Sequence, residues 1–146
     1  MRELDRRNPR KNNRAHAYGD LVDLIMLEER LSGRSQQIDG SIATPFGAAF
    51  AQTGAYTDPA RQLLGAEQEA WLFERLRNSP AKWKFLGQGV MFAQLKVPGY
   101  GLPNAQGGGL FLNSDQWDGY QPARNRVYDV ITSSSTCTSA ATCCWT

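Results

Sequence analysis

Three consecutive charged residues, Glu28, Glu29 and Arg30, combine two carboxylates with a guanidinium group at a place where ligands often bind. They follow residues 21–27, an apolar run rich in Leu, Val and Ile that is interrupted only by Asp23. This run predicts a strand with both faces largely covered. Because ligands of open α/β sheets bind at the carboxyl ends of strands, the three residues are either ligand contacts or ordinary residues at the solvent edge.

A second segment, DQWDGY at residues 115–120, places Trp117 between Asp115 and Asp118. It is either part of the wall of an active site or a polar loop in which Trp117 and Tyr120 hold the backbone against the core. The second possibility is open because an aromatic ring buries a large area and keeps one polar tip.

A helix and a second strand are predicted to position these segments. Residues 65–80 have acidic side chains near the start and basic ones near the end, as the helix dipole favours, and Leu72 and Leu76 form an apolar stripe for the core. Residues 82–85 alternate basic and aromatic side chains, which predicts a half-exposed strand. Beyond it, Gln88 lies between two glycines that allow a close backbone approach or a bulge.

Two long loops and a second helix, which begins near Pro122, are predicted for most of the remaining chain. Residues 33–62 contain Gly, Ser, Thr, Pro and Gln without a sustained period. Residues 99–109 are glycine-rich but lack the lysine of a phosphate-binding P-loop, so we expect a flexible loop. Val127 and Ile131, four residues apart, give the second helix its apolar face.

Composition and charge are typical of one globular domain with a basic start. The chain has 146 residues, of which 41% are hydrophobic and 21% charged, and its net charge is +2. Basic side chains dominate residues 1–14, so we expect residues 1–17 to form a basic arm. The arm is either a solvated linker or a salt-dependent contact for phosphate groups. No apolar run suits a membrane span, and the start lacks the apolar core of a signal peptide.

The last segment, residues 132–146, has a composition that no packed element has. It contains five Thr, four Ser and three Cys and no charged residue. Adjacent Cys143 and Cys144 rarely form a disulfide with each other, and the cysteines lack the spacing of a zinc site. Read in either of the other two frames, the codons for residues 141–146 encode an apolar run. We therefore expect this low-complexity tail to be out of frame.

Four stretches together resemble the alkaline phosphatase D (PhoD-like) metallophosphatases, in the same order along the chain. They are YGDLVDLIMLEERLSGRSQQ, LLGAEQEAWLFERL, WKFLGQGVMFAQL and DQWDGYQPARNRVYD, and they lie between Tyr18 and Asp129. The resemblance implies an α/β fold in which residues 18–131 form part of a metallophosphoesterase-type αββα sandwich. It also implies a hydrolase of phosphate esters, in which metal ions neutralise the phosphoryl charge and supply the nucleophile.

The resemblance places Arg30, Gln88, Trp117 and Asp118 on the substrate side of the site. The guanidinium group of Arg30 can bond two phosphate oxygens at once, and Trp117 would form a wall of the cavity.

Behind them, Glu28 and Asp115 are expected to orient neighbouring groups in the intact parent protein. The family usually has Asp-Thr-Arg or Glu-Thr-Arg where this chain has Glu28-Glu29-Arg30. The middle residue therefore departs from the family, and the local charge is more negative.

The metal ligands of the family are expected outside this chain. Divalent or trivalent ions of the calcium and iron type are implied for the parent, but its Gly-Asp, Asp-Asp-His and Asn ligand loops would precede Met1. Its Gly-Asp-x-His stretch would follow the helix that contains Asp129. The only histidine, His16, lies in the basic arm, where we expect a solvated side chain. We therefore expect no metal bound to this chain.

Two functions follow from these expectations. The first is a piece of an exported phosphatase, periplasmic or extracellular, that hydrolyses phosphate esters with no specific nucleic acid or membrane partner; this chain alone would be inactive. The alternative is a non-catalytic remnant that binds anionic polymers through the basic arm at residues 1–17.

Overall fold

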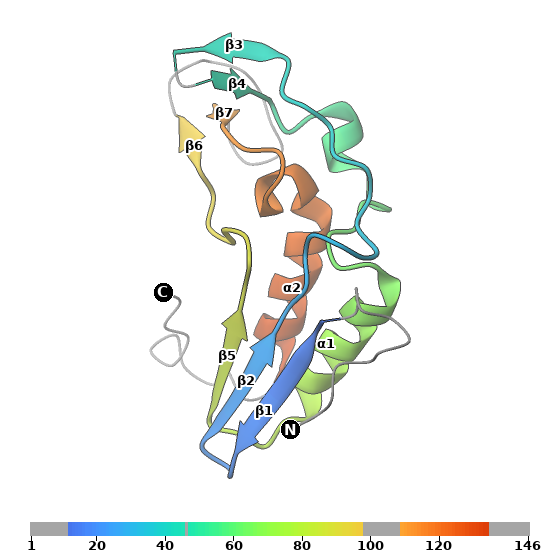
Figure 1. Ribbon diagram of the computed structural model, residues 1–146, viewed down its shortest axis with the longest axis vertical. Coiled ribbons are helices and arrows are strands. Elements are labelled where there is room, and N and C mark those ends of the chain that lie inside the picture. The colour runs from blue at the N-terminus through green and yellow to red at the C-terminus, as the bar shows by residue number, and fades with distance from the viewer. Residues whose placement is uncertain (1–11, 46, 98–108, 135–146) are drawn as a thin grey trace.

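The computed structural model describes residues 12–45, 47–97 and 109–134 (Figure 1). The strands are β1 (Arg14–Tyr18), β2 (Val22–Met26), β3 (Ile42–Thr44), β4 (Gly47–Ala49), β5 (Trp83–Gly87), β6 (Lys96–Val97) and β7 (Leu110–Phe111). The α-helices are α1 (Ala66–Asn78) and α2 (Gln121–Ser133), and the 3-10 helices are η1 (Gly54–Thr57) and η2 (Trp117–Tyr120). The chain is therefore an α/β protein, as predicted.

The main sheet has the strand order β1-β2-β5. β1 is antiparallel to β2, whereas β2 is parallel to β5, with Val22 opposite Trp83 and Met26 opposite Gly87. Parallel neighbours need a long connection, and α1 lies within it. β2 and β5 consequently end at the same edge of the sheet, which we call the carboxyl edge (Figure 1).

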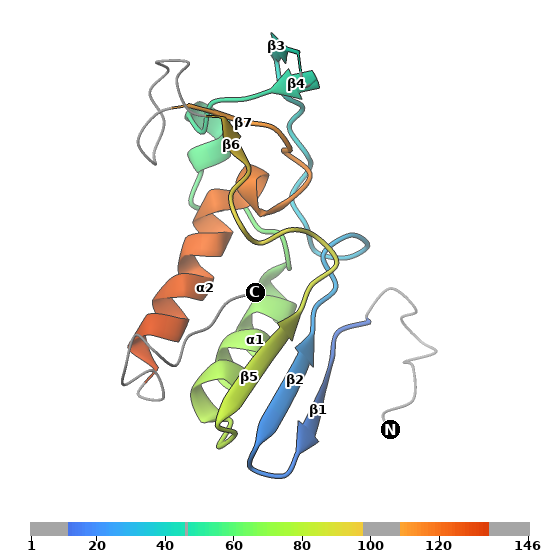
Figure 2. The same ribbon diagram turned by 90° about the vertical axis from the view of Figure 1, so that its left-hand side faces the viewer.

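Both α-helices lie on one face of this sheet (Figure 2). The core between them contains Ile25 of β2, Leu72 and Leu76 of α1, and Val127 and Val130 of α2. The apolar stripe predicted for residues 65–80 thus packs in the core, because side chains four positions apart lie on the same side of a helix.

Only one face of β2 is fully covered by the described residues. Asp23 and Ile25 point toward the helices and are wholly buried, while the alternate residues of the strand are half-buried. The predicted strand is confirmed, and its second face is largely but not fully covered by the described residues. Asp23 can be buried because Arg75 donates two hydrogen bonds to its carboxylate, at 2.7 and 2.9 Å. Burial opposes its ionisation, but the hydrogen bonds of Arg75 and Ser79 outweigh burial and hold the pKa of Asp23 below its usual value.

Two predicted irregular segments contain strands. Arg14–Tyr18, at the end of the expected basic arm, pairs with β2 as β1. The predicted loop at residues 33–62 contains η1 and the β3–β4 hairpin, in which each strand has three residues. Segments this short cannot display a sustained period in the sequence, so the pattern gave no signal.

The second helix begins beside Pro122 as predicted, and it continues through Ser133. Its last two residues thus belong to the segment predicted to be out of frame. Thr132 and Ser133 donate their hydroxyl groups to carbonyls of the preceding turn, which satisfies these side chains within the helix. Within the described residues, no helix is both long and apolar enough to cross a bilayer.

Candidate active site at the carboxyl edge

The carboxyl edge brings together residues that are far apart in the sequence. Arg30, which follows β2, contacts Asp115 of the segment before η2. Gln88, which follows β5, contacts Trp117 of η2. Parallel pairing of β2 with β5 explains this convergence, because it places both strand ends at the same edge.

Glu28 holds the turn that carries Arg30. Its Oε1 accepts hydrogen bonds from the backbone N–H groups of Arg30 and Leu31, both at 2.7 Å. Its Oε2 accepts from the N–H and the hydroxyl group of Ser32, at 3.0 and 2.9 Å. Glu28 therefore orients its neighbours, and its carboxylate is fully engaged in doing so.

The backbone of Glu28 is fixed in turn by Gln68, in the first turn of α1. The Gln68 side chain donates to the carbonyl of Glu28 at 2.7 Å and accepts from its N–H at 2.8 Å. The Gln68 amide thus satisfies the N–H and the C=O of Glu28, as the backbone of a neighbouring strand would do. Sequence analysis missed Gln68, because its amide looks like any other polar side chain of a helix.

Two glycines let the loop after β2 lie directly on the start of α1. Gly33 and Gly65 both have φ near +76°, and a Cβ atom on Gly33 would lie 2.8 Å from the Cα atom of Gly65. Only glycine combines this left-handed backbone with so close an approach. The turn that carries Arg30 is therefore tied to the helix at both ends.

Asp115 bridges two arginines at the carboxyl edge. Its Oδ2 accepts from Nη1 of Arg30 at 2.9 Å, and its Oδ1 accepts from Nη2 of Arg34 at 2.7 Å. Partial burial opposes ionisation of Asp115, but the hydrogen bonds and charges of Arg34 and Arg30 outweigh it and hold the pKa of Asp115 below its usual value. The Arg30 side chain is 55% exposed, so its guanidinium group is accessible to an anion.

Trp117 lies in the interior. It is wholly buried, and its indole N–H donates to Oε1 of Gln88 at 2.6 Å, while Phe92 packs edge-on against its ring. This is the packing that the alternative prediction describes, in which Trp117 and the equally buried Tyr120 hold the loop to the core. Gln88 is half-buried, and its side-chain carbonyl is occupied by this contact.

Asp118, expected on the substrate side, points away from the surface. Its Oδ1 accepts from Nη1 of Arg124 at 2.7 Å, and each side chain is only 1% exposed. Its Oδ2 accepts from the backbone N–H of Leu95 at 2.8 Å. The expectation for Asp118 is therefore corrected: the turn of η2 directs its carboxylate inward, where it holds the segment before α2 against the chain after β5.

Glu29, the middle residue of the Glu28-Glu29-Arg30 run, is a further buried carboxylate at this edge. Its Oε2 accepts from the backbone N–H of Gly89 at 2.9 Å, which confirms the predicted close approach at the glycines around Gln88. Its Oε1 is buried and has no hydrogen-bond partner among the described residues. Burial and the nearby charge of Glu28 raise the pKa of Glu29, against the opposing effects of the Gly89 N–H and Arg30.

The described residues do not fit a metal centre. No three His, Cys, Asp or Glu side chains in residues 12–45, 47–97 and 109–134 come close enough to hold an ion. At the carboxyl edge, the carboxylate of Glu28 is taken up by backbone N–H groups and that of Asp115 by two guanidinium groups. His16 lies on β1 opposite Leu24, not beside this edge.

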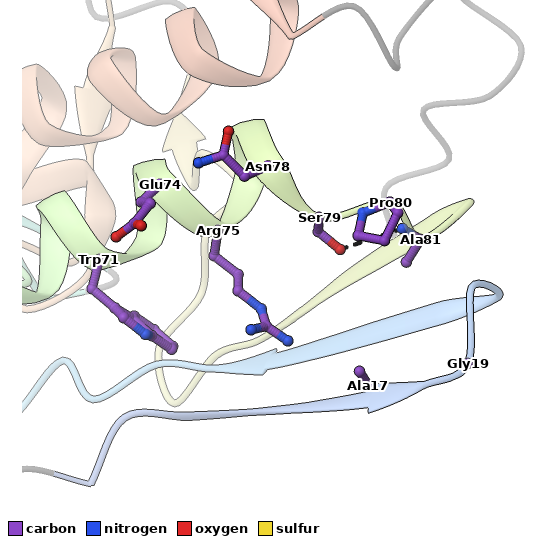
Figure 3. A pocket seen from close by; sticks show the side chains of 9 residues that line it. All are labelled: Ala17, Gly19, Trp71, Glu74, Arg75, Asn78, Ser79, Pro80 and Ala81. Atoms are coloured by element: carbon purple, nitrogen blue, oxygen red, sulfur yellow. Dashed lines mark hydrogen bonds between the residues drawn. The ribbon is translucent and has the colours of Figure 1, made fainter.

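A cavity of about 360 Å³ lies at the other end of the sheet, between α1 and β1 (Figure 3). Trp71 and Arg75 extend from the helix over the strands, and Ala17 faces them from β1. The Arg75 guanidinium group is already bound to buried Asp23. This cavity contains none of the residues predicted for the site.

Three predictions fall on segments outside the described residues. They are most of the basic arm, with residues 1–11, the glycine-rich loop, with residues 98–108, and most of the low-complexity tail, with residues 135–146.

Comparisons with known proteins identify the family of this chain. The model of the PhoD-like phosphatase family matches residues 1–138. Alkaline phosphatase D of Bacillus subtilis (strain 168) is 32% identical over 120 residues, which are 82% of this chain and 18% of that protein. A solved structure of PhoD superposes with a TM-score of 0.67 and 31% identity, covering 84% of this chain and 21% of that one. This chain thus spans about a fifth of the length of these relatives, and it belongs to the PhoD-like phosphatase family.

Proposed function

We propose that the carboxyl edge forms the phosphate-contacting side of a phosphoester hydrolase site, with Arg30 as the residue that binds the phosphoryl oxygens. The observation that carries the proposal is the state of Arg30, whose guanidinium group is half-exposed although one of its nitrogens is held by Asp115. Its backbone is also held, through Glu28. An exposed but oriented guanidinium group suits a planar, bidentate contact with phosphate.

The chemistry that these residues supply is positioning and charge stabilisation. Arg30 would bind two oxygens of the ester and offset negative charge that develops as the phosphoryl group is transferred. Glu28 holds the backbone of Arg30 and Asp115 holds its guanidinium group, so little order has to be gained when substrate binds. The metal ions implied by the family would be held by residues other than the described ones.

Binding of inorganic phosphate by the full chain tests the role of Arg30. At constant ionic strength, we expect Arg30→Ala to weaken phosphate binding at least about tenfold, because hydrogen bonds to charged groups are lost. Arg77→Ala is the matched control, since Arg77 is an exposed arginine on α1 far from the carboxyl edge in sequence. Equal affinity of the two variants would remove Arg30 from the site.

We also propose that this chain alone does not hydrolyse phosphate esters. The support is the donor chemistry of the carboxyl edge, where the carboxylates of Glu28 and Asp115 are already engaged. The test is a chromogenic phosphate ester with the purified chain, with and without added calcium and iron ions. Turnover that depends on these ions would contradict the proposal. Export of the parent protein stays a prediction.

A further inference from the structure

We infer that Arg34 is a positioning residue for Arg30 and acts through the carboxylate of Asp115. The inference rests on the proposed phosphate-binding role of Arg30. It concerns a residue four positions further along the chain, which the pattern of charges did not single out.

Arg34 is held by the core. Its Nη2 and Nε donate to the hydroxyl group of Tyr120, at 2.9 and 3.3 Å, and its guanidinium carbon lies 5.2 Å from the centre of that ring. The hydroxyl group of Tyr120 donates onward to the carbonyl of Ser35 at 2.9 Å. The guanidinium carbon of Arg61 lies 4.6 Å from the centre of the same ring. Tyr120 is wholly buried, so this arrangement fixes Arg34 firmly.

The two arginines use Asp115 unequally. The Arg34 side chain is 17% exposed, whereas that of Arg30 is 55% exposed. Each takes a different oxygen of the carboxylate, Oδ1 for Arg34 and Oδ2 for Arg30. The core therefore restrains Arg30 indirectly. Arg34, which is fixed by the core, holds the carboxylate of Asp115, and this carboxylate holds the exposed guanidinium group of Arg30.

This arrangement leaves one edge of the Arg30 guanidinium group free to bind a ligand. Among the described residues, only Nη1 of its guanidinium group makes a hydrogen bond, to Asp115. The edge formed by Nε and Nη2 is therefore open to two oxygens of one phosphate group. Without Arg34, Asp115 would lose its shorter ion pair, and Arg30 would regain rotamer freedom that phosphate binding must then remove.

The experiment follows the Nε–H signal of Arg30 by ¹⁵N NMR while inorganic phosphate is added to the full chain at constant ionic strength. We expect the signal to move in the wild-type protein. In Arg34→Lys, which keeps the charge but loses the fork that joins Tyr120 to Asp115, we expect about three- to tenfold weaker phosphate binding at Arg30. The matched control is Arg77→Lys, which should bind as the wild type does.

A second readout separates positioning from general stability. The carboxyl pKa of Asp115, followed by ¹³C NMR, should rise in Arg34→Lys and stay unchanged in Arg77→Lys, because lysine makes a weaker pair in this geometry. If Arg34→Lys does not fold, Asp115→Asn carries the same test. It removes the charge that holds Arg30 while leaving the contact of Arg34 with Tyr120, and it should weaken binding to a similar extent.

Each outcome decides between the claims. Weaker binding together with the raised pKa supports the positioning role. Unchanged affinity in the Arg34 or Asp115 variant, with a clear wild-type response at Arg30, overturns the positioning role and leaves the proposed function standing. No wild-type response at Arg30 overturns the proposed function, and the inference that rests on it falls too.

Discussion

Asp115 and Asp118 lie three positions apart and both bind arginine, yet the two ion pairs differ in exposure. Asp118 and Arg124 are each 1% exposed, whereas Asp115 is 30% exposed and its partner Arg30 is 55% exposed. The buried pair ties η2 to α2, while the exposed pair holds a guanidinium group at the surface. The same two residue types thus form a structural ion pair in one place and, in the proposed site, a ligand contact in the other, and solvent exposure separates the two pairs.

Neither role is visible in the letters DQWDGY, because η2 decides which carboxylate points inward. The turn puts Asp118 between Arg124 and the N–H of Leu95, where both carboxylate oxygens are satisfied. Asp115 precedes the turn, and its backbone N–H bonds to the side chain of Asn113 at 2.9 Å.

Removing one partner of the buried pair should cost the most stability. We expect Arg124→Met to lower the free energy of unfolding by about 3–5 kcal/mol, because it leaves the Asp118 carboxylate buried without its counter-charge. Urea unfolding measures the change. Arg77→Met, the same substitution at an exposed position, should change stability by less than about 0.5 kcal/mol. Similar values for the two variants would show that the buried pair has no structural role.

The glycine contact under the Arg30 turn should be the next most sensitive feature. We expect Gly33→Ala to cost about 2 kcal/mol or more, because φ is +76° and the new Cβ would lie 2.8 Å from the backbone of Gly65. Gly19→Ala is the control, since its φ is also positive, at 61°, but no atom lies within 4 Å of the added Cβ. Thermal unfolding of both variants separates the clash from the backbone cost. Equal losses would mean that the close approach contributes nothing.

Replacing Glu29, whose buried Oε1 has no hydrogen-bond partner among the described residues, should stabilise the protein. The folded state raises the pKa of Glu29 above its usual value near 4.5, so the folded form binds the proton more tightly than the unfolded chain. The stability that protonated Glu29 contributes is therefore fully present below about pH 4.5, and it is lost as the pH rises through the raised pKa. We expect Glu29→Gln to gain on the order of 1 kcal/mol at pH 8 and nothing at pH 4. A gain that does not depend on pH would contradict a buried, charged Glu29.

The exposed pair should contribute the least to stability. We expect Asp115→Asn to lower the free energy of unfolding by less than about 1 kcal/mol at pH 7, since exposed ion pairs stabilise weakly. The folded state lowers the pKa of Asp115 below 3.8, so its contribution is present above that pH and is lost as the pH falls through the lowered pKa. The difference from the wild type should therefore shrink in acid. A loss as large as that of Arg124→Met would erase the distinction between the two pairs.

The elements could be predicted where a long periodic pattern marked them. α1, α2 and the two parallel strands appear as runs with a helical or alternating period, and the convergence at the carboxyl edge follows from their order. β3, β4, β6 and β7 could not be predicted, because strands of two or three residues display no period. β1 was missed for a different reason. Its residues RAHAY follow a segment rich in basic residues, so most of the strand was included in the predicted basic arm.

The site was predictable in position but not in detail. Glu28, Arg30 and Asp115 could be singled out from the charged residues after a predicted strand and from the resemblance. The structure brings them into contact, and their roles stay predictions. The inward turn of Asp118 could not be foreseen, since it depends on the backbone of η2. Arg34 was missed for a similar reason, because its partners lie 81 and 86 residues further along the chain.

The most direct test of a phosphate contact at the carboxyl edge is a map of backbone amide shifts as inorganic phosphate is added to the full chain at constant ionic strength. We expect the largest shifts to fall on residues 30–34 and 113–116, around the exposed pair, and the signals of Arg124 and its neighbours to stay still. Shifts that gather instead around Arg75, in the cavity at the opposite end of the sheet, or at Asp118 and Arg124, would contradict a phosphate contact at the carboxyl edge.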